Sequence, residues 1–307
     1  MIEIFSDLQL LGTIFAALLG LAFGSFLNVF LARFPEGESI VTPRSHCRHC
    51  EHILAWWENL PLLSWILLRG RCRSCRHSIG LRYPMVELAV ALLWTLCWLR
   101  FSKPLFVSGF ASGFASGFAN SEIPHLLAHC LIQVAGYAVL CWLLVALAAL
   151  DAEHFWLPDW LTLPGVGAGL LFALLATWSS WYFDQPANVL HAAWRSALAI
   201  LASGGLILFI RLAYWLVRRQ EGIGLGDAKL MAMLGAWLGL RGALEAFMLA
   251  AFLASAAAIL WLAVLTIRRK TSGWSQMPLP LGTFLCIAGL VEVFYPHWLL
   301  KAARLGF

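Results

Sequence analysis

Two aspartates stand next to long apolar runs, where charged side chains are rare in this sequence. Asp227 follows a glycine-rich stretch at 222–226, and Asp151 ends the apolar run 126–150. Two carboxylates that lie close together do not both ionise easily, so one holds a proton while the other activates water. The structural alternative makes Asp227 a helix cap and Asp151 an interfacial charge at the end of a membrane helix. Acid–base chemistry requires both aspartates on the same side of the membrane.

Four cysteines form two pairs with metal-ligand spacing. Cys47 and Cys50 make the first Cys-x-x-Cys pair, Cys72 and Cys75 the second, and 21 residues separate the pairs. This spacing predicts a tetrahedral zinc site closed by four thiolates. A structural disulfide is not expected in a reducing cytoplasm. A thioredoxin-like redox pair is the remaining alternative, although no βαβ pattern surrounds it.

Four histidines in or beside the cysteine pairs are alternative ligands: His46, His49, His52 and His77. We expect these histidines to be solvated loop residues, because four thiolates already fill the coordination shell of the zinc ion. The other four cysteines lie in apolar runs, which predicts small buried core residues: Cys97, Cys130, Cys141 and Cys286.

Composition identifies a multi-span membrane protein. The chain is 61% hydrophobic and only 12% charged, and its mean hydropathy is +0.80. The net charge of +5 comes mainly from arginines in loops, which indicates topology signals and attraction to lipid headgroups rather than nucleic-acid binding. The first apolar run is long and has no basic start, so no cleavable signal peptide is expected.

The apolar runs predict an all-α polytopic membrane protein with about eight transmembrane helices. The predicted spans are 8–34, 84–99, 126–150, 160–178, 191–217, 230–240, 243–267 and 279–294. The span at 230–240 is short, and we expect it to cross a thinned or tilted region.

Arginine-rich segments predict which side each aspartate faces. The long polar segment 33–82 is basic and is therefore expected in the cytoplasm, with the amino terminus outside. Basic clusters at 218–219 and 268–270 mark the same side. Counting spans from these marks places Asp151 and Asp227 together at the cytoplasmic face.

Within the first two predicted spans, a few residues suggest helix contacts. Gly20 and Gly24 are four apart, a spacing that permits close approach of a second helix. Asn28 is expected to make an interhelical hydrogen bond. Glu87 is either a paired structural acid or part of a site that faces the cytoplasm. Between the second and third spans, a Ser-Gly-Phe-Ala repeat at 108–119 is typical of low-complexity filler in an external loop.

The order of the motifs resembles that of the bacterial type IV prepilin peptidases, a family of GxGD membrane aspartyl proteases that often also act as methyltransferases. The resemblance covers most of the chain and includes the cysteine loop with Glu58, Asn59 and Gly70 between its halves. The other matching motifs are GSFLNV at 24–29, RYPMVE at 82–87, LPDWLTLP at 157–164, GLGD at 224–227 and PLGTF at 280–284.

This resemblance implies an inner-membrane endopeptidase that removes the short basic leader of prepilins or pseudopilins at the cytoplasmic face. Asp151 and Asp227 would form the catalytic dyad, and the pair as a unit would supply the acid and the base. Gly224 and Gly226 would let the backbone at Asp227 approach the substrate. Lys229 is expected to neighbour a carboxylate or a lipid headgroup. The substrates would serve pili, type II secretion or DNA uptake.

The resemblance also implies methylation of the new amino terminus with S-adenosylmethionine. The matching region holds Glu58, Asn59 and Gly70, and no separate nucleotide-binding motif is visible. The chain would then divide into a first transmembrane helix at 1–34, a cytoplasmic four-cysteine loop at 35–82 and a transmembrane protease core at 83–307.

Two other functions use the same residues. A proton-coupled transporter would relay protons through Asp151 and Asp227, and it predicts acids near mid-membrane and broken helices in two repeated halves. A non-catalytic scaffold for an envelope machine would bind partners through the zinc loop. We expect prepilin substrates and membrane lipids as partners, and no nucleic acid.

Overall fold

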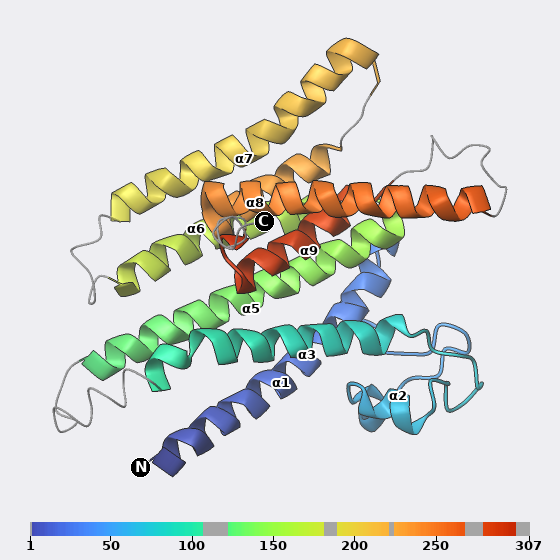
Figure 1. The fold of residues 1–307 in the computed structure, drawn as a ribbon. Coiled ribbons are helices and arrows are strands. Elements are labelled where there is room, and N and C mark those ends of the chain that lie inside the picture. The colour runs from blue at the N-terminus through green and yellow to red at the C-terminus, as the bar shows by residue number, and fades with distance from the viewer. Residues whose placement is uncertain (1, 107–121, 181–188, 221–223, 268–278, 299–307) are drawn as a thin grey trace. The chain divides into compact units, whose positions relative to one another are not determined.

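The computed structural model describes residues 2–106, 122–180, 189–220, 224–267 and 279–298. The predicted repeat at 108–119 lies outside these residues. Within them the protein is helical, and the β-bridges are two isolated ones, His46 with Ile53 and Arg71 with Ser78. The long helices are α1 (Ile2–Arg33), α3 (Arg82–Phe101), α5 (Glu122–His154), α6 (Asp159–Ser180), α7 (Val189–Arg218), α8 (Leu225–Ile267) and α9 (Leu281–Phe294), and the short ones are η1 (Phe34–Glu36), η2 (Trp56–Asn59) and α2 (Leu63–Leu67) (Figure 1).

Six helices in the described part are long and apolar enough to cross a membrane, so the prediction of eight was wrong in number. The helix α9 has 14 residues and is about 21 Å long, which is short of the roughly 30 Å hydrocarbon layer. The predicted span 230–240 is not a separate helix, because it lies within α8. The all-α polytopic class was predicted correctly.

The helix α8 consists of two arms that meet at Gly239. Gly239 has φ 72° and ψ 172°, a backbone conformation open to glycine and strained for other residues. The chain turns back sharply there, as Figure 1 shows for the orange helix. The sequence pattern placed the two apolar stretches correctly but took them for separate spans, because it did not show that one glycine joins them.

The chain divides into two compact units, residues 1–146 and 147–307, and the division falls within α5. In the first unit α1 packs closely against α3. A Cβ atom at Gly20 would lie 2.7 Å from the Ala91 Cα, and one at Gly24 would lie 2.7 Å from the Glu87 Cα. The predicted small-residue contact is therefore confirmed, and a side chain at either glycine would force the two helices apart.

Polar and sulfur-containing groups inside the helices follow the sequence-based expectations. Asn28 donates from Nδ2 to the Tyr83 carbonyl of α3 at 2.8 Å, which is the predicted interhelical hydrogen bond. The four cysteines outside the loop are buried core residues, as expected: Cys97, Cys130, Cys141 and Cys286. The Asn28 hydrogen bond holds the start of α3 against the end of α1, and the cysteine loop connects these two helix ends.

In the second unit, glycines let α6 and α7 approach the first arm of α8. Trp237 donates from Nε1 to the Gly165 carbonyl at 2.8 Å and packs over Gly169, where a Cβ atom would lie 2.6 Å from the Trp237 Cδ1. On the other side, a Cβ atom at Gly235 would lie 2.6 Å from the Ala199 carbonyl oxygen of α7. The first arm of α8, which carries Asp227 in its first turn, is therefore packed tightly on two sides.

We expect Gly235→Ala to lower the stability of the protein by about 1–3 kcal/mol, because the new methyl group overlaps the backbone of α7. Gly205→Ala, on α7, is the matched control, because a Cβ atom there has nothing within 4 Å. Thermal unfolding in detergent measures both variants. Equal melting temperatures for the two would show that α7 and α8 are not packed as described.

Candidate active sites

Asp151 lies in the last turn of α5 and is buried. The helix stops three residues later, and Phe155 then takes a left-handed backbone with φ 51° while its N–H still bonds the Asp151 carbonyl at 2.9 Å. The following residues Leu157 and Pro158 are buried, so the chain folds back over the end of the helix. Leu157 of this returning segment and Asp151 line the same cleft.

The start of α9 holds the Asp151 carboxylate in place. Its Oδ2 accepts the Thr283 backbone N–H at 2.6 Å, and the Thr283 hydroxyl lies 3.0 Å from the same oxygen and 3.2 Å from the Ala148 carbonyl. N–H groups in the first turn of a helix lack partners within that helix and favour an anion. Asp151 satisfies one of these groups from a distant part of the chain.

Two glycines and one leucine bring the segments around Asp151 together. A Cβ atom at Gly282 would lie 2.9 Å from the Asp151 Cγ and 2.9 Å from the Leu157 Cδ1. A Cβ atom at Gly226 would lie 3.0 Å from the Leu157 Cβ. Leu157 is thus in contact with the start of α9 and the start of α8. Only glycine fits at positions 226 and 282 without displacing Leu157.

Asp227 is the third residue of α8 and is half-buried. It lies within the first helical turn, where free N–H groups favour a carboxylate. Gly224 precedes the helix, and a Cβ atom there would touch the Asp227 Oδ2 at 3.4 Å. The predicted glycine positions therefore border the aspartate, and Gly226 additionally permits the contact with Leu157.

Both aspartates line one open cleft of about 470 Å³. The complete lining is Asp151, Phe155, Trp156, Leu157, Asp159, Gly224, Gly226, Asp227 and Lys229. The structure therefore brings together the two acids that are 76 positions apart in the sequence. Both aspartates border the same open cleft, which is the arrangement that paired acid–base chemistry needs.

Lys229 pairs with Asp159 at the same cleft, with its Nζ 2.5 Å from the Asp159 Oδ1. Asp159 begins α6, and 55% of its side chain is exposed. The ion pair joins the first turns of α6 and α8. Lys229 neighbours a carboxylate, as the sequence predicted, and the carboxylate is that of Asp159.

The four loop cysteines come together in the first unit. The Cys47 and Cys75 sulfur atoms are 3.9 Å apart, those of Cys50 and Cys72 are 4.0 Å apart, and all four lie within 4.8 Å of one another. A tetrahedral zinc ion with bonds of about 2.3 Å separates its sulfur ligands by about 3.8 Å. The tetrad therefore has the size and chemistry of a structural zinc site.

Both cysteine pairs use the same backbone pattern. The N–H of Cys47 bonds the His52 carbonyl at 2.9 Å, and the N–H of Cys72 bonds the His77 carbonyl at 2.9 Å. The residue after each second cysteine, Glu51 or Arg76, has positive φ and turns the chain back. The backbone N–H of Cys75 is the main cause that lowers the pKa of the Cys72 thiol to about 7, which favours the thiolate that a metal requires.

The four nearby histidines have other contacts in the described structure. The His49 and His77 rings stack on each other at 4.5 Å, His46 Nδ1 lies 3.1 Å from the Arg44 carbonyl, and His52 Nε2 lies 3.5 Å from Glu58 Oε2. Among the described residues, the metal-ligand group in the loop consists of the cysteines alone.

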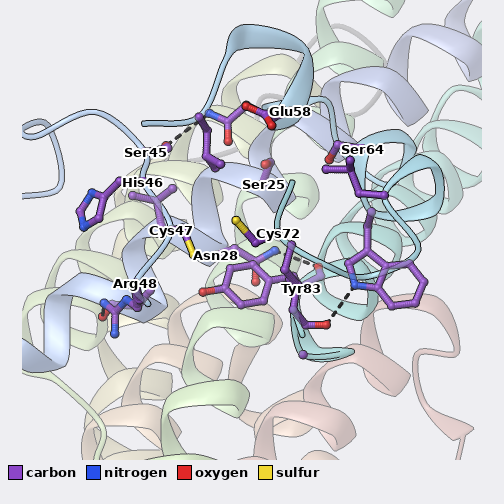
Figure 2. A pocket seen from close by; sticks show the side chains of 18 of the residues that line it. Ser25, Asn28, Ser45, His46, Cys47, Arg48, Glu58, Ser64, Cys72 and Tyr83 are labelled. Carbon is purple, nitrogen blue, oxygen red and sulfur yellow. Dashed lines mark hydrogen bonds between the residues drawn. The ribbon is translucent and has the colours of Figure 1, made fainter. Parts of the chain in front are cut away.

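A pocket of about 440 Å³ lies between the cysteine loop and the facing ends of α1 and α3. Ser25, Asn28 and Tyr83 from the helices lie across from Cys47 and Cys72 of the loop, as Figure 2 shows. Glu58, Asn59 and Glu87 also line it. Glu87 accepts the Leu62 N–H at 2.8 Å, so it is bonded to the loop and also borders the pocket.

Two oxygen atoms of this pocket's lining have no hydrogen-bond partner within the described residues: Asn28 Oδ1 and Glu58 Oε1. Only 1% of the Glu58 side chain is exposed, and its other oxygen accepts the Ala55 N–H at 2.8 Å. Buried acceptors without partners cost free energy, so a bound molecule that donates to them would be stabilised. This pocket is therefore a second candidate site.

Gly70 does not line the pocket but supports the loop beside it. It has φ 67°, and a Cβ atom there would lie 2.8 Å from the Trp65 Cζ2. Trp65 lines the pocket and donates from Nε1 to the Ile79 carbonyl at 3.2 Å. The sequence analysis grouped Gly70 with Glu58 and Asn59, and the structure assigns it a supporting position.

Three residues around Asp151 were not identified as site residues from the sequence: Leu157, Gly282 and Thr283. Their motifs, LPDWLTLP and PLGTF, had been noticed without a role. A glycine and a threonine directly before an apolar run are also common at ordinary helix starts, so only the folded contact with Asp151 identifies them.

Two family profiles match separate parts of the chain. Residues 18–101 match the profile described as the bacterial peptidase A24 N-terminal domain, and residues 138–263 match that of the type IV leader peptidase family. The first covers the cysteine loop and its pocket, and the second covers both aspartates.

Curated relatives are similar over most of the chain, and each bears the name prepilin leader peptidase/N-methyltransferase. The protein of Myxococcus xanthus is 39% identical over 81% of this chain and 63% of its own length. That of Stutzerimonas stutzeri is 32% identical over 91% of this chain and 89% of its own. That of Burkholderia pseudomallei strain 1026b is 36% identical over 93% of this chain and 87% of its own length. No solved structure matches the chain.

Proposed function

Because the chain belongs to the type IV leader peptidase family, we propose that it is a membrane aspartyl endopeptidase that removes the leader of prepilins or pseudopilins. The observation that carries this proposal is the single cleft lined by Asp151 and Asp227. The names of the relatives also include methyl transfer, which we assign to the second candidate site.

Cleavage would use the two aspartates as one unit. One carboxylate takes a proton from water as the water attacks the scissile carbonyl, and the other, protonated, donates to the carbonyl oxygen or the leaving nitrogen. Thr283 holds Asp151 through its N–H and its hydroxyl, and the first turn of α8 holds Asp227.

Co-expression with candidate prepilins tests the proposal. We expect the substrate to become shorter by its leader, as read by gel mobility and by the mass of the new amino terminus. The same prepilins expressed without this protein serve as the uncleaved control. The substrates should include prepilins or pseudopilins from pilus, secretion and DNA-uptake systems. If all of them keep their leader in cells that express well-folded wild-type protein, the peptidase assignment is refuted.

Gly282→Ala should reduce cleavage by about tenfold or more, because its methyl group would overlap the Asp151 carboxyl carbon and Leu157. Gly167→Ala is the matched control, since a Cβ atom there has nothing within 4 Å. Rates of leader removal with purified protein in detergent measure both. A Gly282→Ala variant with the wild-type rate would show that the position of Asp151 does not depend on the close approach of α9.

The pocket beside the cysteine loop is our candidate for the methyl-transfer site. Its volume of about 440 Å³ falls in the range of small-molecule sites, and the free acceptors Asn28 Oδ1 and Glu58 Oε1 fit a ligand rich in amino and hydroxyl donors. S-adenosylmethionine would supply a methyl group from its sulfonium there. The buried Glu58 carboxylate would stabilise positive charge on a bound cation, and Asn59 would bind polar groups at the rim.

We assign zinc to the cysteine tetrad as a structural ion that fixes the loop. Four thiolates leave no open position for a substrate, so the ion would have no direct part in either reaction. Cys47 and Cys72 line the pocket as well as belonging to the tetrad. The ion would therefore shape the pocket wall.

The protein is an integral membrane protein, and we place its aspartate cleft at the cytoplasmic face of the inner membrane. The arginine-rich loop and the basic clusters at 218–219 and 268–270 support this orientation through the positive-inside rule. The division proposed from sequence, with a protease core at 83–307, remains our proposal for the functional parts. Neither the transporter nor the scaffold alternative gains support from the names of the relatives described above.

A further inference from the structure

A third group of ionisable residues lies in the second unit, away from the residues that line the cleft. Glu245 is on the second arm of α8, Glu292 is near the end of α9, and His297 follows α9. None of the three belongs to a motif identified in the sequence. Glu245 and Glu292 lie on apolar helices and are buried. Burying an ionisable group in such a position costs free energy, and such groups often have a function.

The bend in α8 brings the two glutamates together. The second arm starts after Gly239, and Gly242 follows in its first turn. A Cβ atom at Gly242 would lie 3.4 Å from the Glu292 Cγ and 3.6 Å from its Oε1, so the absent side chain admits Glu292. Glu245 is three residues further along the same arm and faces the same region of α9.

Glu245 has a buried oxygen that the described residues leave available. Its Oε1 accepts the Arg241 Nε at 3.0 Å, but its Oε2 is buried and has no hydrogen-bond partner in the described structure. Only 7% of the Glu245 side chain is exposed, while 54% of the Arg241 side chain is. Such an oxygen is destabilising unless a proton or a cation binds it.

The spacing of the group suits a metal ion. The His297 Nδ1 is 3.6 Å from the Glu245 Oε1 and 3.9 Å from the Glu292 Oε1, and one potential ligand atom from each residue lies within 4.8 Å of the others. A four-coordinate ion with bonds of about 2.1 Å separates its ligands by about 3.4 Å. The two histidine distances are therefore only a few tenths of an ångström longer than such an ion requires.

We propose that Glu245, Glu292 and His297 bind one transition-metal dication of the zinc or manganese type. The imidazole nitrogen distinguishes this donor set from the all-oxygen sites of calcium and magnesium. The ion would bind the Glu245 carboxylate through both oxygens, which would give the buried Oε2 a partner, and the half-exposed Arg241 side chain can turn toward solvent. The bound ion would fasten the end of α9 to α8, and the start of α9 holds Asp151 through Thr283. This proposal does not depend on the peptidase assignment.

Manganese binding to the purified full-length protein tests the site by electron paramagnetic resonance, which detects free Mn²⁺ directly. Manganese is chosen because carboxylates suit it and a four-thiolate site favours zinc. We expect one bound Mn²⁺ per chain, and about tenfold or weaker affinity in His297→Asn and in Glu245→Gln. Asparagine tolerates the left-handed backbone of His297, whose φ is 58°, so that variant preserves the fold. Asp7→Asn, which removes an exposed acid on α1, should bind as the wild type does.

A variant with Asp151→Asn and Asp227→Asn separates this site from the cleft. We expect it to lose the proposed cleavage and to keep its Mn²⁺. The ion should also raise the melting temperature of the wild type but not that of His297→Asn, because only a ligand that binds the folded site stabilises it. Absence of bound Mn²⁺ in the wild type would overturn the proposal. So would binding that survives His297→Asn or disappears with the two cleft aspartates.

Discussion

Asp151→Asn and Asp227→Asn should each reduce leader cleavage by about 10³-fold or more while the protein remains in the membrane. An asparagine side chain neither takes a proton from water nor delivers one to the leaving group. The amide is nearly the same size as the carboxyl group, so packing around Leu157 and Gly282 should persist. Because the two aspartates act as one unit, the double variant should be about as inactive as each single variant. The rate of leader removal with purified protein, read by mass, measures the loss.

Asp159→Asn is the control, because Asp159 lines the same cleft but pairs with Lys229. More than half of its side chain is exposed, and exposed ion pairs contribute about 1 kcal/mol or less. We therefore expect a mild effect on cleavage. Wild-type cleavage by either Asp151→Asn or Asp227→Asn would exclude the aspartyl mechanism. Normal envelope assembly in the double variant would favour the scaffold alternative instead.

Features that depend on local sequence could be predicted. Apolar runs indicated the membrane helices, and the spacing of Gly20 and Gly24 indicated a close helix contact that the structure confirms against α3. The interhelical bond of Asn28 followed from the cost of an unpaired amide among apolar residues. The Cys-x-x-Cys spacing indicated the tetrad, because two such turns present four sulfur atoms whenever they meet.

Contacts between distant segments could not be predicted in the same way. Thr283 bonds Asp151 across 132 positions, and no periodicity in either segment encodes that contact. The glutamates Glu245 and Glu292 looked like isolated charges because the turn at Gly239 and the gap at Gly242 become visible only in the fold. The number of spanning helices was wrong for a related reason, since hydropathy measures how apolar a stretch is but not where a helix bends or how far it extends.

Replacing Cys47 and Cys72 together by serine should remove one zinc ion per chain and abolish methyl transfer while cleavage falls only partly. One ligand is lost from each cysteine pair, and the two remaining thiols cannot hold the ion in a tetrahedral shell. The ion contributes folding free energy to the loop, so its loss should disorder the wall that carries Glu58 and Cys72. The aspartates lie on other segments, α5 and α8, and their proton transfer needs no metal. Elemental analysis gives the zinc content, and the mass of the processed amino terminus reports both activities.

Cys97→Ala is the control for the loss of a thiol outside the tetrad, because Cys97 is a buried core residue of α3. It should keep its zinc and both activities. Wild-type protein without zinc would remove the metal from the proposal for the loop. A doubly substituted protein that methylates normally would separate methyl transfer from the pocket beside the tetrad. Complete loss of cleavage in a well-folded double variant would show that the loop is required to present the leader to Asp151 and Asp227.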